Sequence, residues 1–176
     1  MGDHVFLEVE VDGQPIGSIK INLHSELVPR TAHNFAELCT GESKKHCPEG
    51  NRLCYKGSRI HRIVRGCMIQ GGDVTRGDGT GGWSTYGRHF PDEDLRHRHK
   101  HNAAGTVSMA NAGLPHTNQS QFFILTEPQP QLDGAYVVVG RVYEGMEVVK
   151  QLERLPTDID DKPLHDVQIR ESGHCV

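Results

Sequence analysis

The sequence predicts an all-β fold, a sandwich or a closed barrel, with two α-helices covering its ends. Its 20 Gly and nine Pro residues indicate many turns, which favours a loop-rich β protein over a helical bundle. About eight short segments alternate apolar and polar residues, and two longer segments show helical spacing. The 176 residues contain no internal repeat and no linker-like stretch, so we expect one domain over residues 1–176.

The first part of the chain predicts a hairpin followed by a helix. His4–Val11 alternates apolar and polar residues, Asp12-Gly13 is a strong two-residue hairpin turn, and residues 16–23 form the return strand. Residues 25–40 carry a proline suited to a first helical turn and then apolar residues at helical spacing. We expect Gly41 to end this helix as its C-terminal cap.

The rest of the chain predicts short strands, loops and a second helix. The strands are expected at residues 60–63, 67–69, 106–110, 122–126 and 135–142 and from residue 167, and the helix at residues 144–155. Residues 42–57 are polar and indicate an excursion loop. Residues 73–105 are Gly-rich and charged with little periodicity, and a loop of this length in a compact domain is usually functional.

Composition and charge disfavour several classes of protein. The formal net charge of -4 gives no support to a nucleic-acid partner. The mean hydropathy is -0.54, and no apolar run approaches the ~18 residues that span a bilayer. The N-terminus shows no secretory signal, and Phe6 stands where a myristoylation motif requires Ser or Thr. We therefore expect a soluble protein of the cytoplasm, or of the nucleus, with no membrane partner.

The five cysteines are expected to be thiols in a reducing compartment. Cys47 and Cys54, beside His46 in the excursion loop, leave three interpretations open: a structural metal pair, a regulatory disulfide or plain thiols. Plain thiols are favoured because strong zinc sites place their cysteines only two to four residues apart.

Two other patterns each have a ligand-binding and a simpler interpretation. If the run at residues 95–101 is extended, His97, His99 and His101 share one face and could hold a metal loosely, but the interleaved Arg and Lys favour a solvated loop. Residues 77–82 contain G-x-G-x-x-G, yet no helix opens after them, which favours a turn-rich loop without a cofactor. The sequence contains neither the G-x-S-x-G nor the H-E-x-x-H motif, so no motif supports a hydrolase.

Residues 59–73, RIHRIVRGCMIQGGD, contain two short alternating runs separated by Arg65-Gly66. Side chains two apart lie on the same side of a strand, so Arg62, Met68 and Gln70 can share one face. That face is either a binding surface that combines a cation, an apolar group and an amide, or one side of an ordinary half-buried hairpin.

Long stretches of the chain are similar to cyclophilins, the family of peptidyl-prolyl cis-trans isomerases. The similarity is carried, in order, by DGQPIGSIKINL, VPRTAHNFAELCTGE, YKGSRIHRIVRGCMIQGGD, TRGDGTGG, SMANAG, SQFFI and GRVYEGMEVV. The resemblance implies an eight-stranded antiparallel closed barrel capped by two α-helices. It also implies an enzyme that isomerises X–Pro bonds without a cofactor or a metal.

The resemblance implies that Arg62 is the catalytic residue. Amide resonance sets a barrier of ~18–20 kcal/mol, and as the bond twists the prolyl nitrogen regains a lone pair that a fixed guanidinium stabilises. The remaining implied site residues bind substrate: Met68, Phe123 and Leu132 line the proline pocket, Gln70, Asn111 and Gln121 hold the flanking peptide, Ala110 lies on the groove floor, and Cys67 and Tyr136 stand at the pocket wall and edge.

This chain departs from the usual family pattern around the pocket. Cys67 stands where the family commonly has Phe, and the lost burial is expected to cost about 1–2 kcal/mol. Gln131 replaces a Trp that packs on cyclosporin, so weak cyclosporin binding is implied. Tyr136 replaces a His, which is a mild change. One extra residue within residues 113–117 is expected to reshape the groove rim.

Two functions remain to be distinguished. The first is a monomeric isomerase acting on proline-containing peptides and unfolded chains. The second is a proline-peptide-binding module of a larger assembly, in which turnover is incidental. Arg62 favours the enzyme because binding alone does not require it, whereas Cys67 and Gln131 leave room for the module. The loop around Cys47 and Cys54 corresponds to an insertion in a divergent subset of the family, where thiol-dependent regulation has been proposed.

Overall fold

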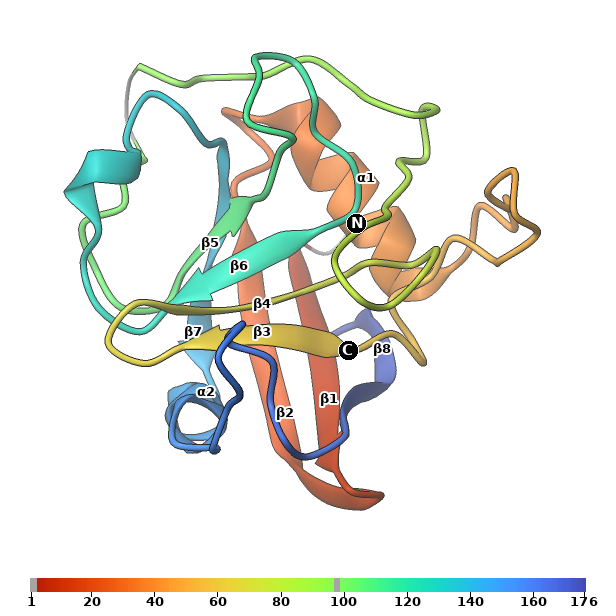
Figure 1. Ribbon diagram of the computed structural model, residues 1–176. Helices are drawn as coiled ribbons and strands as arrows, with labels where there is room; N and C mark the ends of the chain where they lie inside the picture. Colours follow the sequence, from red (N-terminus) through yellow and green to blue (C-terminus); the bar gives the residue numbers. More distant parts are fainter. Residues whose placement is uncertain (1–2, 97–98) are drawn as a thin grey trace.

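The computed structural model describes residues 3–96 and 99–176, which form an eight-stranded antiparallel sheet with two α-helices and a short 3₁₀ helix (Figure 1). The elements are β1 (His4–Val11), β2 (Gln14–Leu23), α1 (Pro29–Thr40), β3 (Ile60–Val64), β4 (Met68–Gly71), β5 (Thr106–Met109), β6 (Phe122–Leu125), η1 (Pro130–Leu132), β7 (Val138–Glu144), α2 (Met146–Glu153) and β8 (Val167–His174). Neighbouring strands follow the order β3-β4-β6-β5-β7-β2-β1-β8.

The two ends of this sheet meet and close it into a barrel. The Gly57 amide donates to the Ile169 carbonyl at 2.7 Å, and the Ile169 amide donates to the Ser58 carbonyl at 2.8 Å. An antiparallel bridge also joins Arg59 to Gln168. These contacts pair the chain entering β3 with β8, so the edge that an open sheet would expose is covered here. The predicted closed barrel is confirmed.

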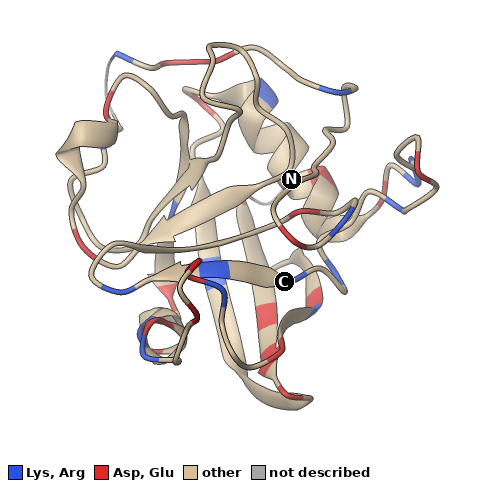
Figure 2. Cartoon of the chain, viewed as in Figure 1, with Lys and Arg blue, Asp and Glu red and all other residues tan. Residues whose placement is uncertain are grey.

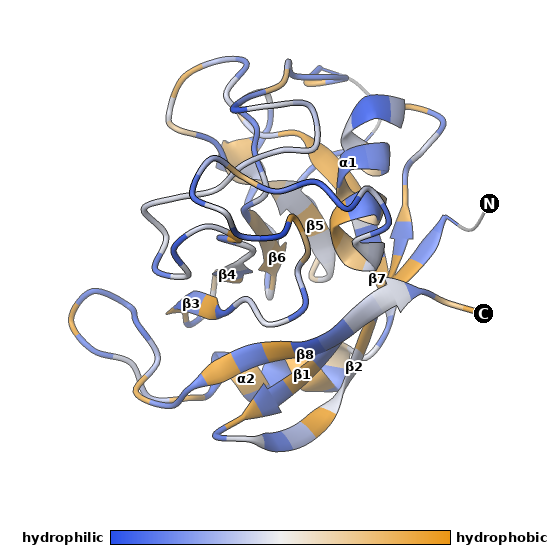
Figure 3. Cartoon of the chain, turned by 90° about the vertical axis from the view of Figure 1, so that its right-hand side faces the viewer, coloured by the Kyte–Doolittle hydropathy of each residue, from blue (hydrophilic) through white to orange (hydrophobic). Residues whose placement is uncertain are grey.

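The first hairpin shows why the local sequence forms strands. Asp12 and Gly13 have φ values of 50° and 81°, the two positive angles that a tight type I′ turn requires. Val5, Leu7 and Val9 are buried in β1, whereas the residues between them are more exposed. Figure 3 shows the resulting alternation of hydrophobic and hydrophilic bands along the strands of this part of the barrel.

The helices α1 and α2 cover opposite ends of the barrel (Figure 1). Helix α1 begins at Pro29, whose missing amide is not needed in the first turn. It ends at Gly41, which has a φ of 68° and donates its amide to the Glu37 carbonyl at 2.7 Å, as predicted. The face of α1 toward the barrel buries Phe35 and Leu38.

Most of the apolar side chains form one core, and a smaller apolar cluster lies apart from it. In the main core, the rings of Phe35, Tyr55 and Phe122 pack with centroids 5.1–5.4 Å apart. The Tyr55 hydroxyl donates to the Ser120 carbonyl at 2.7 Å, which satisfies its buried polar end. The smaller cluster, centred on Met68 and Phe123, belongs to the site described below.

Prediction and structure differ mainly at element boundaries. Strand β4 begins at Met68 rather than residue 67, and β8 continues to His174 well beyond its apolar start. Strand β7 begins at Val138 rather than residue 135, because the Ala135 amide donates to the Leu132 carbonyl at 3.2 Å and extends the turn after η1. Among the described residues, no helix has both the length and the apolar character needed to cross a bilayer.

Candidate active site

The β3–β4 hairpin brings three of the predicted site residues together. Arg62 pairs with Gln70 and Val64 pairs with Met68 in the antiparallel register, so all four side chains point to the same face of the sheet. Gly66, with a φ of 76°, makes the turn that joins the strands. The prediction that Arg62, Met68 and Gln70 share one face therefore holds.

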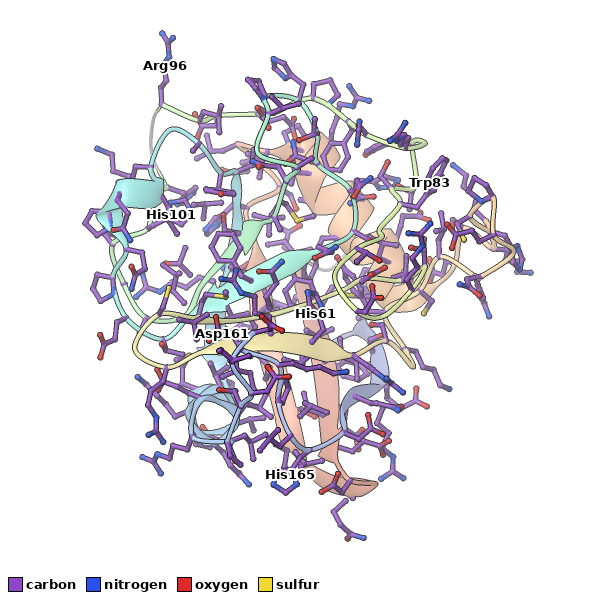
Figure 4. All side chains as sticks on the ribbon, viewed as in Figure 1. His61, Trp83, Arg96, His101, Asp161 and His165 are labelled. Carbon is purple, nitrogen blue, oxygen red and sulfur yellow. The ribbon has the colours of Figure 1, made fainter. Side chains whose placement is uncertain are left out.

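The Arg62 guanidinium is half exposed, and Asp161 is its acidic neighbour. The Arg62 Nη2 and Asp161 Oδ2 atoms are 3.9 Å apart, and the Arg62 side chain is 48% exposed. The Ile63 amide donates to the Asp161 carbonyl at 2.8 Å, which fixes the loop between α2 and β8 against β3 (Figure 4). Figure 2 shows the basic position on β3 next to acidic positions of the loop before β8. An ion pair this long leaves the guanidinium able to donate to a substrate.

An apolar cluster lies beside this hairpin, and we call it the proline pocket after the role expected of its residues. Met68 and Phe123 are 6% and 5% exposed, and the Phe123 ring packs edge-on against Tyr136 with centroids 5.5 Å apart. The cluster is completed by fully buried Leu125 and by partly buried residues around it: Val64, Cys67, Ala110, Leu132 and Tyr136. The structure thus gathers into one cluster every residue that was expected to line the proline pocket or the groove floor.

The amide side chains form a polar border to the pocket. Gln70 donates through Nε2 to Oε1 of Gln121 at 3.0 Å. Gln121 in turn donates to the carbonyls of Gly79 and Gly81 at 2.9 and 2.7 Å. Both N–H groups of the Gln121 amide bind the loop at residues 79–81, so the orientation of this amide is fixed. Its oxygen then holds the Gln70 side chain in place. Of the two amides, Gln70 lines the polar hollow described below.

Asp73 holds the loop that orients Gln121, a role that no local sequence pattern indicates. Its Oδ1 accepts the amides of Thr75 and Arg76, and its Oδ2 accepts those of Gly79 and Gly81, at 2.9–3.1 Å. Burial raises the pKa of Asp73, but these backbone donors outweigh it and the net pKa is lowered. The carboxylate therefore stays ionised and keeps the loop closed.

Ala110 and Asn111 form the far rim of the groove. The Ala110 amide donates to the Gln121 carbonyl at 3.0 Å. The Asn111 side chain donates to the Ala135 carbonyl at 2.9 Å and accepts the Gly113 amide at 2.9 Å. The Asn111 side chain is therefore engaged within the protein.

A polar hollow lies beside Arg62 and Gln70. The hollow has a volume of about 490 Å³ and is lined by Arg62 and Gln70 together with residues 76–80 and parts of the loop at residues 158–166. It is open toward solvent, as a peptide chain entering or leaving the groove requires. Residues from loops far apart in the sequence thus share this surface.

His101 lies behind the pocket wall, contrary to the expectation of a solvated loop. It is 1% exposed, its Nδ1 lies 2.9 Å from Oδ1 of Asp133, and its Nε2 lies 2.8 Å from Oγ of Ser108. Its ring stacks on Phe123 with centroids 6.0 Å apart. Burial lowers the pKa of His101, and the Asp133 carboxylate offsets only part of that effect.

This Asp–His–Ser arrangement does not form a hydrolytic site. Ser108 is 0% exposed, so its hydroxyl cannot reach a substrate carbonyl. The solvated-loop interpretation is wrong for His101, because its imidazole is buried and contacts Asp133, the residue after Leu132 of the proline pocket. His99 lies in the loop and is half-buried, and its ring stacks on His24 with centroids 3.5 Å apart. His97 lies outside the described residues.

The cysteines are free thiols in the structure. Cys47 is buried and Cys54 is half-buried, with the Cys54 Sγ 4.0 Å from the Cys39 carbonyl oxygen. Burial raises the pKa of the Cys67 thiol, and Arg62 lowers it slightly. In the described part of the chain, no group of three or more His, Cys, Asp or Glu is arranged to hold a metal. The thiol and redox interpretations of Cys47 and Cys54 stay predictions.

Comparison with known proteins agrees with this geometry. The family model of the cyclophilin type peptidyl-prolyl cis-trans isomerase matches residues 6–174. The chain is 50% identical over 172 residues to the peptidyl-prolyl cis-trans isomerase cyp11 of Rhizopus delemar, covering 98% of this chain and 50% of that protein. It is 48% identical over 172 residues to the peptidyl-prolyl cis-trans isomerase 9 of Caenorhabditis briggsae, covering 98% of this chain and 54% of that protein.

A third relative is much longer. The NK-tumor recognition protein of Homo sapiens is 47% identical over 166 residues, which are 94% of this chain and 11% of that protein. The chain thus spans about half the length, or less, of these relatives. The whole-chain family match and the groove described above lead to one conclusion: this chain belongs to the family of cyclophilin-type peptidyl-prolyl cis-trans isomerases.

Proposed function

We propose that this chain catalyses the cis-trans isomerisation of X–Pro bonds in peptides and folding proteins, with Arg62 as the catalytic residue. The observation that carries the proposal is the register of β3 and β4. It places the Arg62 guanidinium opposite Gln70 and beside the apolar pocket of Met68 and Phe123. A cation with several donors next to a hollow for a proline ring is the arrangement that this reaction requires.

The chemistry follows from the electronic change at the amide. Twisting the X–Pro bond breaks the resonance that makes it planar, and the prolyl nitrogen regains a lone pair. The pocket holds the ring, while Gln70, Gln121 and the backbone of Asn111 hold the flanking peptide. Arg62 then donates toward that nitrogen in the twisted state, where the interaction is stronger than in either planar form. No covalent bond is made and no proton is permanently transferred.

Exchange spectroscopy on an X–Pro peptide tests the proposal. Wild type should accelerate cis-trans exchange, and Arg62→Ala should lose about 100-fold or more, the usual effect of deleting one donor to a transition state. Arg65→Ala is the matched control, because Arg65 is exposed on the turn of the same hairpin and its guanidinium donates to the Arg154 carbonyl at 3.4 Å. Equal rates for wild type and Arg62→Ala would refute the assignment.

A proline-peptide-binding module is the second candidate. Cys67 supports it, because a small thiol replaces part of the pocket wall and is only partly buried against the cluster. The match to a small part of the much longer NK-tumor recognition protein is a second reason to weigh it. Under this function, the protein would bind the peptide with an affinity similar to that of the isomerase but would leave its exchange rate unchanged.

We also propose that the chain binds cyclosporin weakly and acts as a monomer. Gln131 lies exposed on η1, where it donates to Oε1 of Gln129 at 2.6 Å. Its amide is therefore engaged within the protein, and it offers a ligand no aromatic surface.

A further inference from the structure

A second hollow adjoins the proline pocket on the side of Tyr136. Its volume is about 270 Å³, and it lies between the turn after β5 and the turn after η1. The residues that line it are Asp92, Leu95, Asn111, Gly113, Leu114, Pro115, Gly134, Ala135 and Tyr136. Leu114 and Pro115 belong to the turn after β5, residues 113–117, which forms one wall of the hollow.

The turn that carries Leu114 is rigid. The Thr117 hydroxyl donates to the Leu114 carbonyl at 2.7 Å and accepts the Ala112 amide at 2.9 Å. The Gly113 amide is bound by Asn111, and His116 adopts a φ of 59°. A turn fixed in this way loses little entropy when a ligand packs against it.

The polar groups of this hollow are already paired. Asp92 accepts the Asn118 side-chain amide at 2.7 Å through Oδ1 and the His116 amide at 3.0 Å through Oδ2, and its side chain is 4% exposed. The Asn111 side chain is committed to Ala135 and Gly113. A charged ligand would have to break these hydrogen bonds to bind either side chain. The surface that remains for a ligand in the hollow is therefore apolar.

Leu114 supplies much of that surface. It is 64% exposed, a large apolar side chain left open to water. Leu95 and Pro115 line the same hollow, and Leu95 is half-buried. Covering such side chains with another apolar group removes their surface from water, which is favourable.

Tyr136 joins the hollow to the proline pocket. Its ring packs on Phe123 inside the pocket and also lines the hollow. A peptide whose proline packs against Phe123 has the hollow within reach of a neighbouring residue, because Tyr136 is shared by both and consecutive Cα atoms are about 3.8 Å apart. Continuity with the pocket makes the substrate itself the occupant.

We propose that Leu114, with Leu95 and Pro115, forms a specificity subsite that takes an apolar side chain of the substrate within two residues of the proline. The inference rests on the proposed function, since it assumes that the proline occupies the adjacent pocket. It adds a preference among X–Pro sequences that Arg62 and the pocket do not themselves provide.

Peptide titrations followed by NMR test this subsite. The parent peptide is Gly-Gly-Pro-Gly-Gly with blocked ends, and each flanking Gly is replaced in turn by Leu, Lys or Glu. At one flanking position, Leu should tighten binding about fivefold. This gain is smaller than the ~10–200-fold that one methylene contributes in an enclosed pocket, because this hollow is open to solvent. Lys and Glu should give no such gain, and the Leu gain should persist at high salt.

Leu114→Ser provides the variant, and Leu164→Ser is the matched control because Leu164 is similarly exposed, at 66%, but lies outside the hollow. Leu114→Ser should reduce the Leu gain to less than about twofold and leave the parent peptide unaffected, as a double-mutant cycle measures. Leu164→Ser should change neither.

The inference is overturned if no flanking Leu tightens binding, if Lys or Glu gains as much as Leu, or if the two variants behave alike. These results are separate from the test of Arg62. A protein that binds Leu-containing peptides through Leu114 without accelerating exchange retains the subsite and loses the proposed catalysis. A protein that accelerates exchange equally on all peptides retains catalysis and loses the subsite.

Discussion

Replacing His101 by Phe tests whether a buried hydrogen-bonded chain holds the proline pocket in shape. The imidazole lies between Asp133 and Ser108 and stacks on Phe123. Phe retains a flat ring of similar size, so His101→Phe removes the hydrogen bonds while leaving most of the packing. The backbone amide of residue 101, which donates to Asp133 Oδ1 at 2.7 Å, is kept.

The size of the effect follows from the two lost hydrogen bonds. A bond to a charged group contributes about 1.5–3 kcal/mol and a neutral one about 0.5–1.5 kcal/mol. Ser108 recovers part of this by donating to the Val137 carbonyl, 3.1 Å away, and Asp133 is 30% exposed and can be hydrated. We expect a net loss of about 2 kcal/mol, which lowers the melting temperature by roughly 4–8 °C in a domain of this size.

The difference between wild type and variant should also depend on pH. The folded-state pKa of His101 is lowered from 6.5 by burial, so below that pH the unfolded chain binds more protons than the folded protein. Stability from the neutral imidazole is present above pH 6.5 and is lost as pH falls toward the folded-state pKa, by up to about 1.4 kcal/mol per pH unit. The variant lacks this group, so its deficit should shrink on acidification.

Urea unfolding of both proteins at pH 7.5 and pH 5.5 measures this difference, and contributions of other histidines cancel in the subtraction. His165→Gln is the control, since it removes an exposed contact to Asp12 and should cost less than about 1 kcal/mol. A His101→Phe deficit that grows on acidification would mean that the imidazole is charged in the folded protein. A variant as stable and as active as wild type at pH 7.5 would refute the positioning role.

Three further substitutions test other parts of the site. Cys67→Phe should raise kcat/KM on an X–Pro peptide about tenfold, because a half-buried Phe ring restores about 1–2 kcal/mol of apolar contact. An unchanged kcat/KM would show that residue 67 is not part of the wall that binds the proline. Gln131→Trp should tighten cyclosporin binding in a calorimetric titration, and equal affinities would show that residue 131 is not limiting. Asp73→Asn should destabilise the protein by about 2–4 kcal/mol in urea unfolding, because its new amide faces the amides of Gly79 and Gly81 without an acceptor for them.

The barrel could be predicted largely from local pattern. Alternation located β1 with its correct bounds, Asp12-Gly13 marked the hairpin turn, and Gly41 marked the end of α1. Each of these signals has a physical cause within a few residues: burial of one strand face, or a backbone angle that Gly adopts easily. Boundaries near Ala135 were missed because a turn hydrogen bond, which side-chain pattern does not reveal, competes there with the strand.

The site could be predicted only in part, for a different reason. Arg62, Met68 and Gln70 were placed on one face by strand periodicity, but Phe123 and Leu132 entered only through resemblance to a family. The roles of His101 and Asp73 are not visible in strand or helix periodicity. The partners of His101 are Asp133 and Ser108, 32 and seven residues away, and those of Asp73 lie two to eight residues away in an irregular loop. A histidine among Arg and Lys looks solvated until the fold brings a carboxylate and a hydroxyl to its two nitrogens.

The separation of the two apolar clusters explains how this chain can depart from its family at the pocket and still keep the fold. Phe35, Tyr55 and Phe122 stabilise the main core, whereas Cys67 and Tyr136 touch only the smaller cluster. Cavities in the main core are costly because its side chains have no route to solvent. Around the smaller cluster the partly exposed wall can be filled by water or by substrate, so a change there alters affinity more than stability. Selection on substrate preference can therefore act at the groove without weakening the barrel that presents it.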